Sequence, residues 1–157
     1  MQKVALNLAC GKRPDGRGMI PKDCHIVNHE RKHWYGYVDV AWDLRDRPWP
    51  WSDETFDFVL AYDIIEHLVD TVEFMDQCWR ILKPGKAIVI HTNNVEHIEQ
   101  AWRSPSHKRV FTIDTFDFFD PETQWGIDYP ESEFKWELKG KVREGLELKF
   151  CLTKRPL

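Results

Sequence analysis

The sequence lacks a long hydrophobic run, a pair of closely spaced cysteines and an excess of basic residues. No apolar stretch approaches the roughly 20 residues that a membrane-spanning helix needs. Residues 1–3 lead directly into a strand pattern, which predicts no signal peptide. The four cysteines form no Cys-x-x-Cys pair, so we expect reduced thiols and no metal site. These absences predict a cytoplasmic protein that does not enter a membrane.

The overall composition is that of one globular domain. The chain has 157 residues, of which 42% are hydrophobic and 31% charged, and no repeat, low-complexity tract or linker divides it. We therefore predict a single domain over residues 1–157. The formal net charge of -4 argues against general nucleic-acid binding, because such proteins carry a basic excess. Eight tryptophans are many for this length, and some are expected to line a ligand pocket or an interface.

Short apolar runs predict a mostly parallel sheet. The clearest run is Val4–Gly11, whose apolar residues are adjacent rather than alternating and which ends in small residues and a glycine. That pattern is typical of a buried parallel strand that enters a tight turn. Similar runs predict strands over residues 25–30, 38–44, 56–62 and 86–91. The alternating segments 134–143 and 146–153, joined at Glu144-Gly145, predict a C-terminal antiparallel hairpin.

One long helix is predicted after the fourth of these strands, which makes the fold class α/β. Apolar residues recur at three- and four-residue steps from Ile65 to Leu82, which gives a helix one apolar face. Asp70 with Glu73 resembles a capping box, so the regular helix is expected to begin near Thr71. Residues 83–85, Lys-Pro-Gly, are expected to end it. Shorter helices are predicted over residues 95–102 and 112–119, with a loop over 103–110.

The connection between the first two strands, residues 12–24, shows no helical pattern. It is rich in glycine, proline and charge, and is barely as long as the dozen or so residues of a short parallel crossover. We expect a loop or one short turn there, which leaves part of one sheet face with reduced helical cover. Either aromatic side chains or a second subunit in a homodimer could cover that face. The candidate aromatic residues are Trp34, Tyr35, Trp49 and Trp51.

The carboxyl ends of the predicted strands carry groups that suit an adenosine, and ligands of open α/β sheets bind at these ends. The small residues before Gly11 let a ligand approach the backbone. The carboxylate of Glu30 can accept hydrogen bonds from both hydroxyls of a ribose. Asp43, beside an apolar residue, suits the amino group and flat face of an adenine, and Tyr62-Asp63 ends the fourth strand.

These residues resemble the motifs of class I S-adenosylmethionine-dependent methyltransferases, in particular a small helix-poor subgroup whose first strand reads Leu-Asn-Leu-Gly-Cys-Gly. The matching segments are Leu6–Gly11, Val27–Glu30, Trp42–Leu44, Pro50–Asp57, Ile65–Leu68 and Arg80–Lys86. The resemblance implies a Rossmann-like fold and S-adenosylmethionine as the cofactor. Ala9 and Lys86 stand where the family often has glycine. An alanine costs only a methyl group there if its φ is negative.

The resemblance also implies roles for the strand-end residues. The turn after the first strand would pass beneath the methionine part, Glu30 would bind the ribose, and Asp43 with Leu44 would meet the adenine. Tyr62 and Asp63 would line the side near the sulfonium. The implied cofactor-binding residues are Asn7, Ala9, Cys10, Gly11, Glu30, Asp43, Leu44, Tyr62 and Asp63. Because no full helix follows the first strand, the turn cannot rely on a helix dipole. Backbone amides and Glu30 are therefore expected to hold more of the cofactor than they do in the usual fold.

Methyl transfer needs a base only if the acceptor must lose a proton. The candidate catalytic residues are Asp63, which follows a strand end, and His107, whose loop could close over the site. His91 is a further candidate at the end of the neighbouring strand. His67 is interpreted as a buried histidine that ties the helix start to the sheet. Lys108-Arg109 is read as a solvated loop or as a site for an anionic group.

We expect an enzyme that methylates a small-molecule or sugar-like acceptor. No Asp/Asn-Pro-Pro-Tyr/Phe sequence follows the fourth strand, which disfavours amino-group methylation of DNA. The alternative is a non-catalytic module that binds the cofactor or its product within a larger assembly, because residues 105–128 leave little chain for an acceptor pocket. Nicotinamide-dinucleotide binding is disfavoured, since no helix opens after the first glycine turn.

Overall fold

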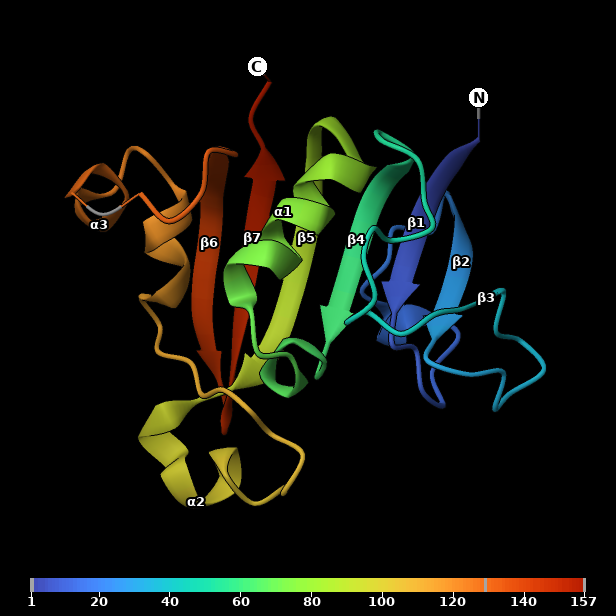
Figure 1. Ribbon diagram of the computed structural model, residues 1–157, viewed down its shortest axis with the longest axis horizontal. Coiled ribbons are helices and arrows are strands. Elements are labelled where there is room, and N and C mark those ends of the chain that lie inside the picture. Colours follow the sequence, from blue (N-terminus) through green and yellow to red (C-terminus); the bar gives the residue numbers. More distant parts are fainter. Residues whose placement is uncertain (1, 129, 157) are drawn as a thin grey trace.

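The computed structural model describes residues 2–128 and 130–156. Within these residues a seven-stranded sheet crosses the molecule in the order β3-β2-β1-β4-β5-β7-β6 (Figure 1). Neighbouring strands from β3 to β5 run parallel, whereas β7 is antiparallel to both of its neighbours. The strands are β1 (Lys3–Leu8), β2 (Cys24–Glu30), β3 (Val40–Ala41), β4 (Phe56–Tyr62), β5 (Leu82–Asn93), β6 (Trp136–Glu144) and β7 (Glu147–Lys154). The predicted α/β fold with a C-terminal antiparallel hairpin is therefore confirmed.

One strand is much shorter than predicted. The expected strand over residues 38–44 is confined to β3, Val40–Ala41, because it lies at the sheet edge and pairs with β2 alone. Beyond Ala41 the chain leaves the ladder, and Asp43 accepts a hydrogen bond from the amide of Arg45 in a local turn. Asp43 and Leu44 therefore lie on a loop that follows the edge strand.

The helix α1 (Thr71–Ile81) covers one face of the sheet (Figure 1). Asp70 Oδ1 accepts a hydrogen bond of 2.9 Å from the amide of Glu73, which confirms the predicted cap. The buried side of α1, which includes Phe74 and Met75, packs on apolar residues of β1, β4 and β5 in the main core. The helix ends just before the Lys-Pro-Gly segment, as predicted.

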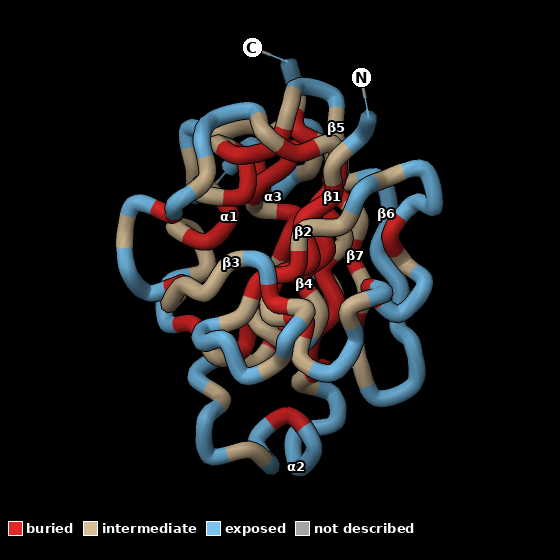
Figure 2. The backbone as a smooth tube through the Cα atoms, turned by 90° about the vertical axis from the view of Figure 1, so that its right-hand side faces the viewer, coloured by how far each residue is buried: buried red, intermediate tan, exposed pale blue. Residues whose placement is uncertain are grey.

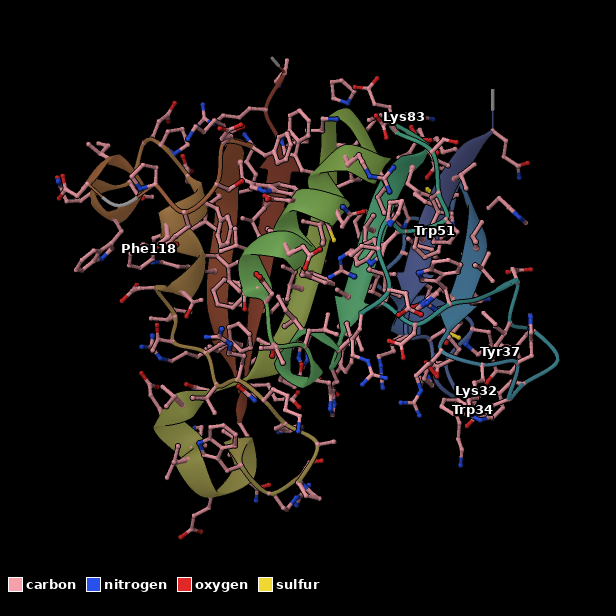
Figure 3. The ribbon with its side chains drawn as sticks, in the orientation of Figure 1. Lys32, Trp34, Tyr37, Trp51, Lys83 and Phe118 are labelled. Carbon is pink, nitrogen blue, oxygen red and sulfur yellow. The ribbon has the colours of Figure 1, made fainter. Side chains whose placement is uncertain are left out.

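Trp49 and Trp51 lie in this same core, and the expectation that they cover the helix-poor face is wrong. The Trp49 ring meets Phe74 of α1 edge-on, with ring centroids 5.6 Å apart. Trp51 lies over the front of the sheet in Figure 3, on the α1 side. Trp34 is 53% exposed. The connection between β3 and β4 thus carries its tryptophans to the side that α1 already covers.

The opposite sheet face has little cover, as predicted. The connection after β1 contains one short 3₁₀ turn, η1 (Gly16–Gly18), and its Ile20 packs on Phe58 and Leu60. Half-buried Val89 extends the same apolar surface toward β5. Figure 2 shows that the central strands are buried along much of their length even so. Strand neighbours and a loop, rather than helices, bury this side.

The remaining elements are short helical turns. A short turn, η2 (Ile65–His67), follows β4, and η3 (Val95–His97) with α2 (Ile98–Ala101) confirms a predicted short helix. The 3₁₀ turn η4 (Thr115–Phe119) begins later than the helix predicted there, and α3 (Gln124–Asp128) was not predicted. No helix in the described ranges is both long and apolar enough to cross a membrane.

Candidate active site

The turn after β1 is fastened to the end of β2. Ala9 has a φ of +51° and Gly11 a φ of +54°. The Ala9 amide donates a hydrogen bond of 3.2 Å to His29 Nδ1, and the Cys10 amide donates one of 2.9 Å to the His29 carbonyl. Ala9 therefore does not have the negative φ that would leave it unstrained, and left-handed backbone costs an alanine about 1–2 kcal/mol. The bonds to His29 stabilise the turn against that cost.

Glu30 and Asp43 stand at the ends of neighbouring segments, in different electrostatic settings. Burial raises the pKa of the half-buried Glu30, opposed by the amide and charge of Arg31. Asp43 accepts hydrogen bonds of 2.9 and 2.5 Å from the guanidinium of Arg45, and this pairing lowers its pKa to about 2. Leu44 is buried beside it. An amino group bound at Asp43 would therefore share that carboxylate with Arg45.

A cavity of about 600 Å³ lies at the carboxyl ends of β1, β2 and β4. It brings together five of the predicted cofactor-binding residues: Ala9, Glu30, Asp43, Leu44 and Asp63. Its other lining residues, which the sequence did not single out for the cofactor, include His29, Arg31, Trp34, Trp42, Arg45, Ile64, His67, Leu68 and Lys108. The loop with Trp34 lies beyond the end of β2 (Figure 3).

Asn7, Cys10 and Gly11 were predicted in the site but do not line this cavity. Asn7 is buried, and its Nδ2 donates a hydrogen bond of 2.9 Å to Asn28 Oδ1. Cys10 is buried as well. The carbonyl of Gly11 accepts a hydrogen bond of 2.6 Å from the hydroxyl of Tyr37. In this structure Asn7 therefore joins β1 to β2, and Tyr37 fixes the Gly11 end of the turn.

Tyr62 also stands outside the cavity wall, between the ring of His91 and the guanidinium of Arg17. Its ring stacks on that of His91 with centroids 4.1 Å apart, and the Arg17 guanidinium lies 3.9 Å from the ring centroid. Burial lowers the pKa of His91, but the hydrogen bond to Asp63 and the charge of Glu147 outweigh it, so the pKa lies above its usual value. Tyr62 thus connects η1 to the ends of β4 and β5.

A second cavity of about 400 Å³ adjoins the first, and Asp63 and His67 line both. His107, a predicted catalytic residue, lines the second cavity. Its Nδ1 donates a hydrogen bond of 2.6 Å to the Ala101 carbonyl, which leaves Nε2 of the neutral ring as an acceptor. The rings of His67 and His107 meet edge-on at 4.8 Å. The two predicted catalytic residues therefore lie at the junction and in the second cavity.

Glu66 lines the second cavity and was not predicted as a functional residue. It is 2% exposed, and its Oε2 accepts a hydrogen bond of 3.0 Å from the hydroxyl of Thr92. Burial raises its pKa to about 7. A carboxyl that titrates near neutral pH can accept or release a proton during a reaction. The available sequence signal was an acid within the apolar stretch from Ile65 to Leu68.

Two groups of side chains near the cavities have the composition of metal ligands. They are Glu66 with His67 and His107, and Asp63 with His91 and Glu147. Within each group the potential ligand atoms all lie within 4.8 Å of one another. The sequence-based expectation that the chain binds no metal therefore stays a prediction.

The larger cavity fits the chemistry of S-adenosylmethionine. Its carboxylates at Glu30, Asp43 and Asp63 can accept hydrogen bonds from ribose hydroxyls and an amino group, and can face a positive charge. Apolar side chains, including Leu44 and Leu68, offer surface to an adenine ring. The cavity thus combines acidic groups and apolar walls at the strand ends.

Known proteins with similar sequences are methyltransferases. A family model described as "Methyltransferase domain" matches residues 28–90. A protein of Mycolicibacterium smegmatis named a probable S-adenosylmethionine-dependent methyltransferase is 36% identical over 69 residues, which are 43% of this chain and 26% of that protein. The human mitochondrial ubiquinone biosynthesis O-methyltransferase is 40% identical over 48 residues, which are 31% of this chain and 13% of that protein. The matched parts thus span about a quarter or less of these relatives.

Solved structures with a similar fold are also methyltransferases. A crystal structure of an S-adenosylmethionine-dependent methyltransferase from Archaeoglobus fulgidus matches 97% of this chain and 86% of its own, with a TM-score of 0.66 and 15% identity. The segment matched by the family model contains Glu30, Asp43 and Asp63, which line the larger cavity. The resemblance recognised from the motifs is confirmed, while the helix-poor subgroup stays a prediction. Residues 28–90 are thus similar to a methyltransferase domain, and the chain shares its fold with solved S-adenosylmethionine-dependent methyltransferases, whose cofactor is S-adenosylmethionine.

Proposed function

We propose that the chain holds S-adenosylmethionine in the larger cavity and transfers its methyl group to a small polar acceptor in the second cavity. The observation that carries this proposal is the shared wall: Asp63 and His67 line both cavities. A methyl donor and an acceptor in adjoining cavities can meet at that wall without leaving the protein. Asp63 would then lie close to the transferred group.

The cofactor would lie across the strand ends as the motifs predict. Glu30 would accept hydrogen bonds from the ribose hydroxyls, and Leu44 with Asp43 would contact the adenine. The turn from Ala9 to Gly11 would pass beneath the methionine part, and the bond from Asn7 Nδ2 to the Arg13 carbonyl would help to hold it. The charge of Asp63 favours binding of the sulfonium and ammonium groups nearby.

When bound, S-adenosylmethionine supplies an activated methyl group on a sulfonium. Residues at the shared wall would hold the acceptor in line with that methyl group, so that the new bond to the methyl carbon would form as the carbon–sulfur bond breaks. The contribution of the protein is mainly alignment of the two molecules in closed, partly apolar surroundings. A hydroxyl acceptor must also lose its proton, and the groups placed to accept it are Asp63, His107 Nε2 and the Glu66 carboxylate. The pKa of Glu66, raised by burial to about 7, suits a general base at neutral pH.

The second cavity favours a small polar acceptor, in keeping with the predicted small-molecule or sugar-like substrate. Its lining contains polar side chains such as Asn93 and Gln100 beside the acids and histidines. The human relative is named a ubiquinone biosynthesis O-methyltransferase, a name that favours an oxygen acceptor. A hydroxyl-bearing small molecule is therefore the first class to test.

Binding tests the cofactor part of the proposal. We expect S-adenosylmethionine and S-adenosylhomocysteine to raise the melting temperature and NADH to leave it unchanged. The Glu30→Ala variant should bind S-adenosylhomocysteine about 1–3 kcal/mol more weakly by calorimetry, as expected for loss of a charged hydrogen-bond acceptor. The exposed Glu99 offers a matched control, because Glu99→Ala removes the same group outside both cavities. An unchanged dissociation constant for Glu30→Ala would remove Glu30 from the site.

Turnover tests the catalytic part. Formation of S-adenosylhomocysteine is measured with panels of hydroxyl, amine and carboxyl acceptors. Turnover with one class supports the enzyme and identifies the acceptor atom. Cofactor binding without turnover on all three classes would favour the alternative, a binding module within a larger assembly.

Two further expectations belong with this proposal. A homodimer through the helix-poor face would cover Ile26, Val89 and their apolar neighbours, which lie beside Ile20 in the second core cluster. Light scattering on the purified chain measures this directly, and a monomer at all concentrations would exclude it. We also propose a cytoplasmic protein without general nucleic-acid affinity, in line with the net charge of -4.

A further inference from the structure

His29 is a buried polar residue in the wall of the larger cavity. It is 1% exposed and sits in β2 between Asn28 and Glu30. Both ring nitrogens are engaged by backbone groups of other segments: Nδ1 by the Ala9 amide at 3.2 Å, and Nε2 by the Trp42 carbonyl at 2.9 Å. A carbonyl can only accept, so Nε2 carries the proton and Nδ1 offers its lone pair to Ala9.

The two bonds span a part of the sheet where the strand ladders stop. The pairing of β1 with β2 ends at Asn7 and Asn28, one residue before His29. β3 pairs with β2 through only Val40 and Ala41. Ala9 and Trp42 both lie just past these ladders, on opposite sides of β2. Main-chain bonds of 2.9 Å still cross here, from the Cys10 amide to the His29 carbonyl and from the Trp42 amide to the Glu30 carbonyl. The His29 ring adds one side-chain bond to each of these two connections.

The ring is held in one orientation. It meets the ring of Trp51 edge-on, with centroids 5.4 Å apart and planes at 73°. Burial lowers its pKa to about 4, so the ring is neutral at physiological pH and keeps the acceptor that Ala9 needs. Ala9, His29 and Trp42 all line the larger cavity. A fixed ring thus sets the spacing of two cavity segments.

We propose that His29 is a positioning residue for the cofactor, which sets the Ala9 turn under the methionine half and the Trp42–Asp43 segment against the adenine half. This inference rests on the proposed function. His29 acts through its two backbone partners rather than on the reacting atoms. Each half of the cofactor then depends on a different nitrogen of one ring.

Two substitutions separate the two nitrogens. In His29→Asn the side-chain oxygen stands near the place of Nδ1 and can accept from Ala9, but nothing reaches Trp42. In His29→Gln the longer amide can donate to Trp42, but the Ala9 amide loses its acceptor. His29→Leu removes both bonds and keeps an apolar side chain of similar bulk. Ile26→Ala is the control, because it shortens a core side chain on the same strand away from the cavity.

The readouts are the dissociation constants of adenosine and S-adenosylhomocysteine, which differ by the amino-acid half. His29→Gln should weaken S-adenosylhomocysteine about tenfold and adenosine less than about twofold, as expected for loss of one hydrogen bond. His29→Asn should weaken both about tenfold and leave their ratio unchanged. His29→Leu should combine the two effects. Ile26→Ala should lower the melting temperature while it preserves both affinities.

Three outcomes would overturn the inference. If His29→Asn and His29→Gln weaken both ligands by the same factor, His29 acts only through general stability. If the variants bind both ligands as the wild type does, His29 has no part in cofactor positioning, although the proposed function stands. If the wild-type chain binds neither S-adenosylmethionine nor S-adenosylhomocysteine, the proposed function and this inference fall together.

Discussion

Replacing Glu66 with glutamine should stabilise the protein above neutral pH. Glu66 is 2% exposed, and burial raises its pKa from the usual 4.5 to about 7. Below pH 4.5 the carboxyl is protonated in both the folded and unfolded states. As pH rises from there to 7, the unfolded chain loses the proton first, so stability falls. Because one pKa unit corresponds to about 1.4 kcal/mol, the folded protein loses about 3 kcal/mol over this range.

The Glu66→Gln side chain has the shape of the protonated acid and keeps an oxygen that can accept from the hydroxyl of Thr92. Its stability relative to wild type should therefore be near zero at about pH 4.5 and about 3 kcal/mol higher at about pH 8. Guanidinium denaturation of both proteins across this range measures the difference. Glu99→Gln is the control, because Glu99 is exposed and should show no such pH-dependent gain.

A pH-independent difference between wild type and Glu66→Gln would refute this account of the buried carboxyl. The same variant should lower turnover if Glu66 accepts the proton of the acceptor. A more stable protein with lower activity would indicate that the buried acid is kept at a cost to stability. A stabilised variant with full turnover would leave the electrostatic account intact and assign the proton to Asp63 or His107.

Two local backbone predictions follow from the described residues and use the same denaturation assay. Ala9→Gly should raise the free energy of unfolding by about 0.5–1 kcal/mol, because glycine adopts the φ of +51° without strain, partly offset by its freedom in the unfolded chain; a lower free energy would contradict the strain assigned to Ala9. Asp70→Ala should lower it by about 1 kcal/mol through loss of the α1 cap, and Asp70→Asn, which keeps an acceptor for the Glu73 amide, should restore most of that loss.

The parts of the fold that sequence predicts well are those whose signals are local. β1, β4 and α1 each carry their apolar pattern and their end signals within a few residues, such as the Asp70 cap. The hairpin of β6 and β7 is equally local, because alternation and one tight turn define it. β3 lacks such a local signal. The length of this two-residue edge strand is set by its pairing with β2, and the sequence of residues 38–44 does not indicate where that pairing stops.

The site is predicted only where a residue's role follows from its place at a strand end. Glu30 and Asp63 follow strand ends in sequence and line the cavity in space. Glu66 could not be found this way, because its burial depends on chain that is distant in sequence. The amides of Lys108 and Arg109 both donate to the Glu66 carbonyl, at 2.7 and 3.2 Å, which closes that loop over it. The pairing of Asp43 with Arg45 was not predicted either, because it depends on the conformation of their loop and not on a sequence pattern.

The shortened connection after β1 changes how the cofactor turn is held. A first helix would offer its N-terminal amides and dipole to the ligand, and the sequence-based expectation moved that task to the backbone amides of the turn. In the structure the amides of Ala9 and Cys10 both donate to His29, and the hydroxyl of Tyr37 donates to the Gly11 carbonyl. These amides shape the turn and are not open to the ligand.

With the Ala9 and Cys10 amides engaged, we expect side chains around the cavity to recognise the charged methionine end. The cations that line it, Arg31, Arg45 and Lys108, are the groups that can meet a carboxylate, and Asp63 can meet an ammonium. Arg45 is already paired with Asp43, which leaves Arg31 and Lys108 as the stronger candidates. A helix-poor site of this kind has several separate charges in place of one helix dipole. Its affinity for the cofactor should therefore fall more steeply with salt concentration than the affinity of a site that relies on a helix dipole alone.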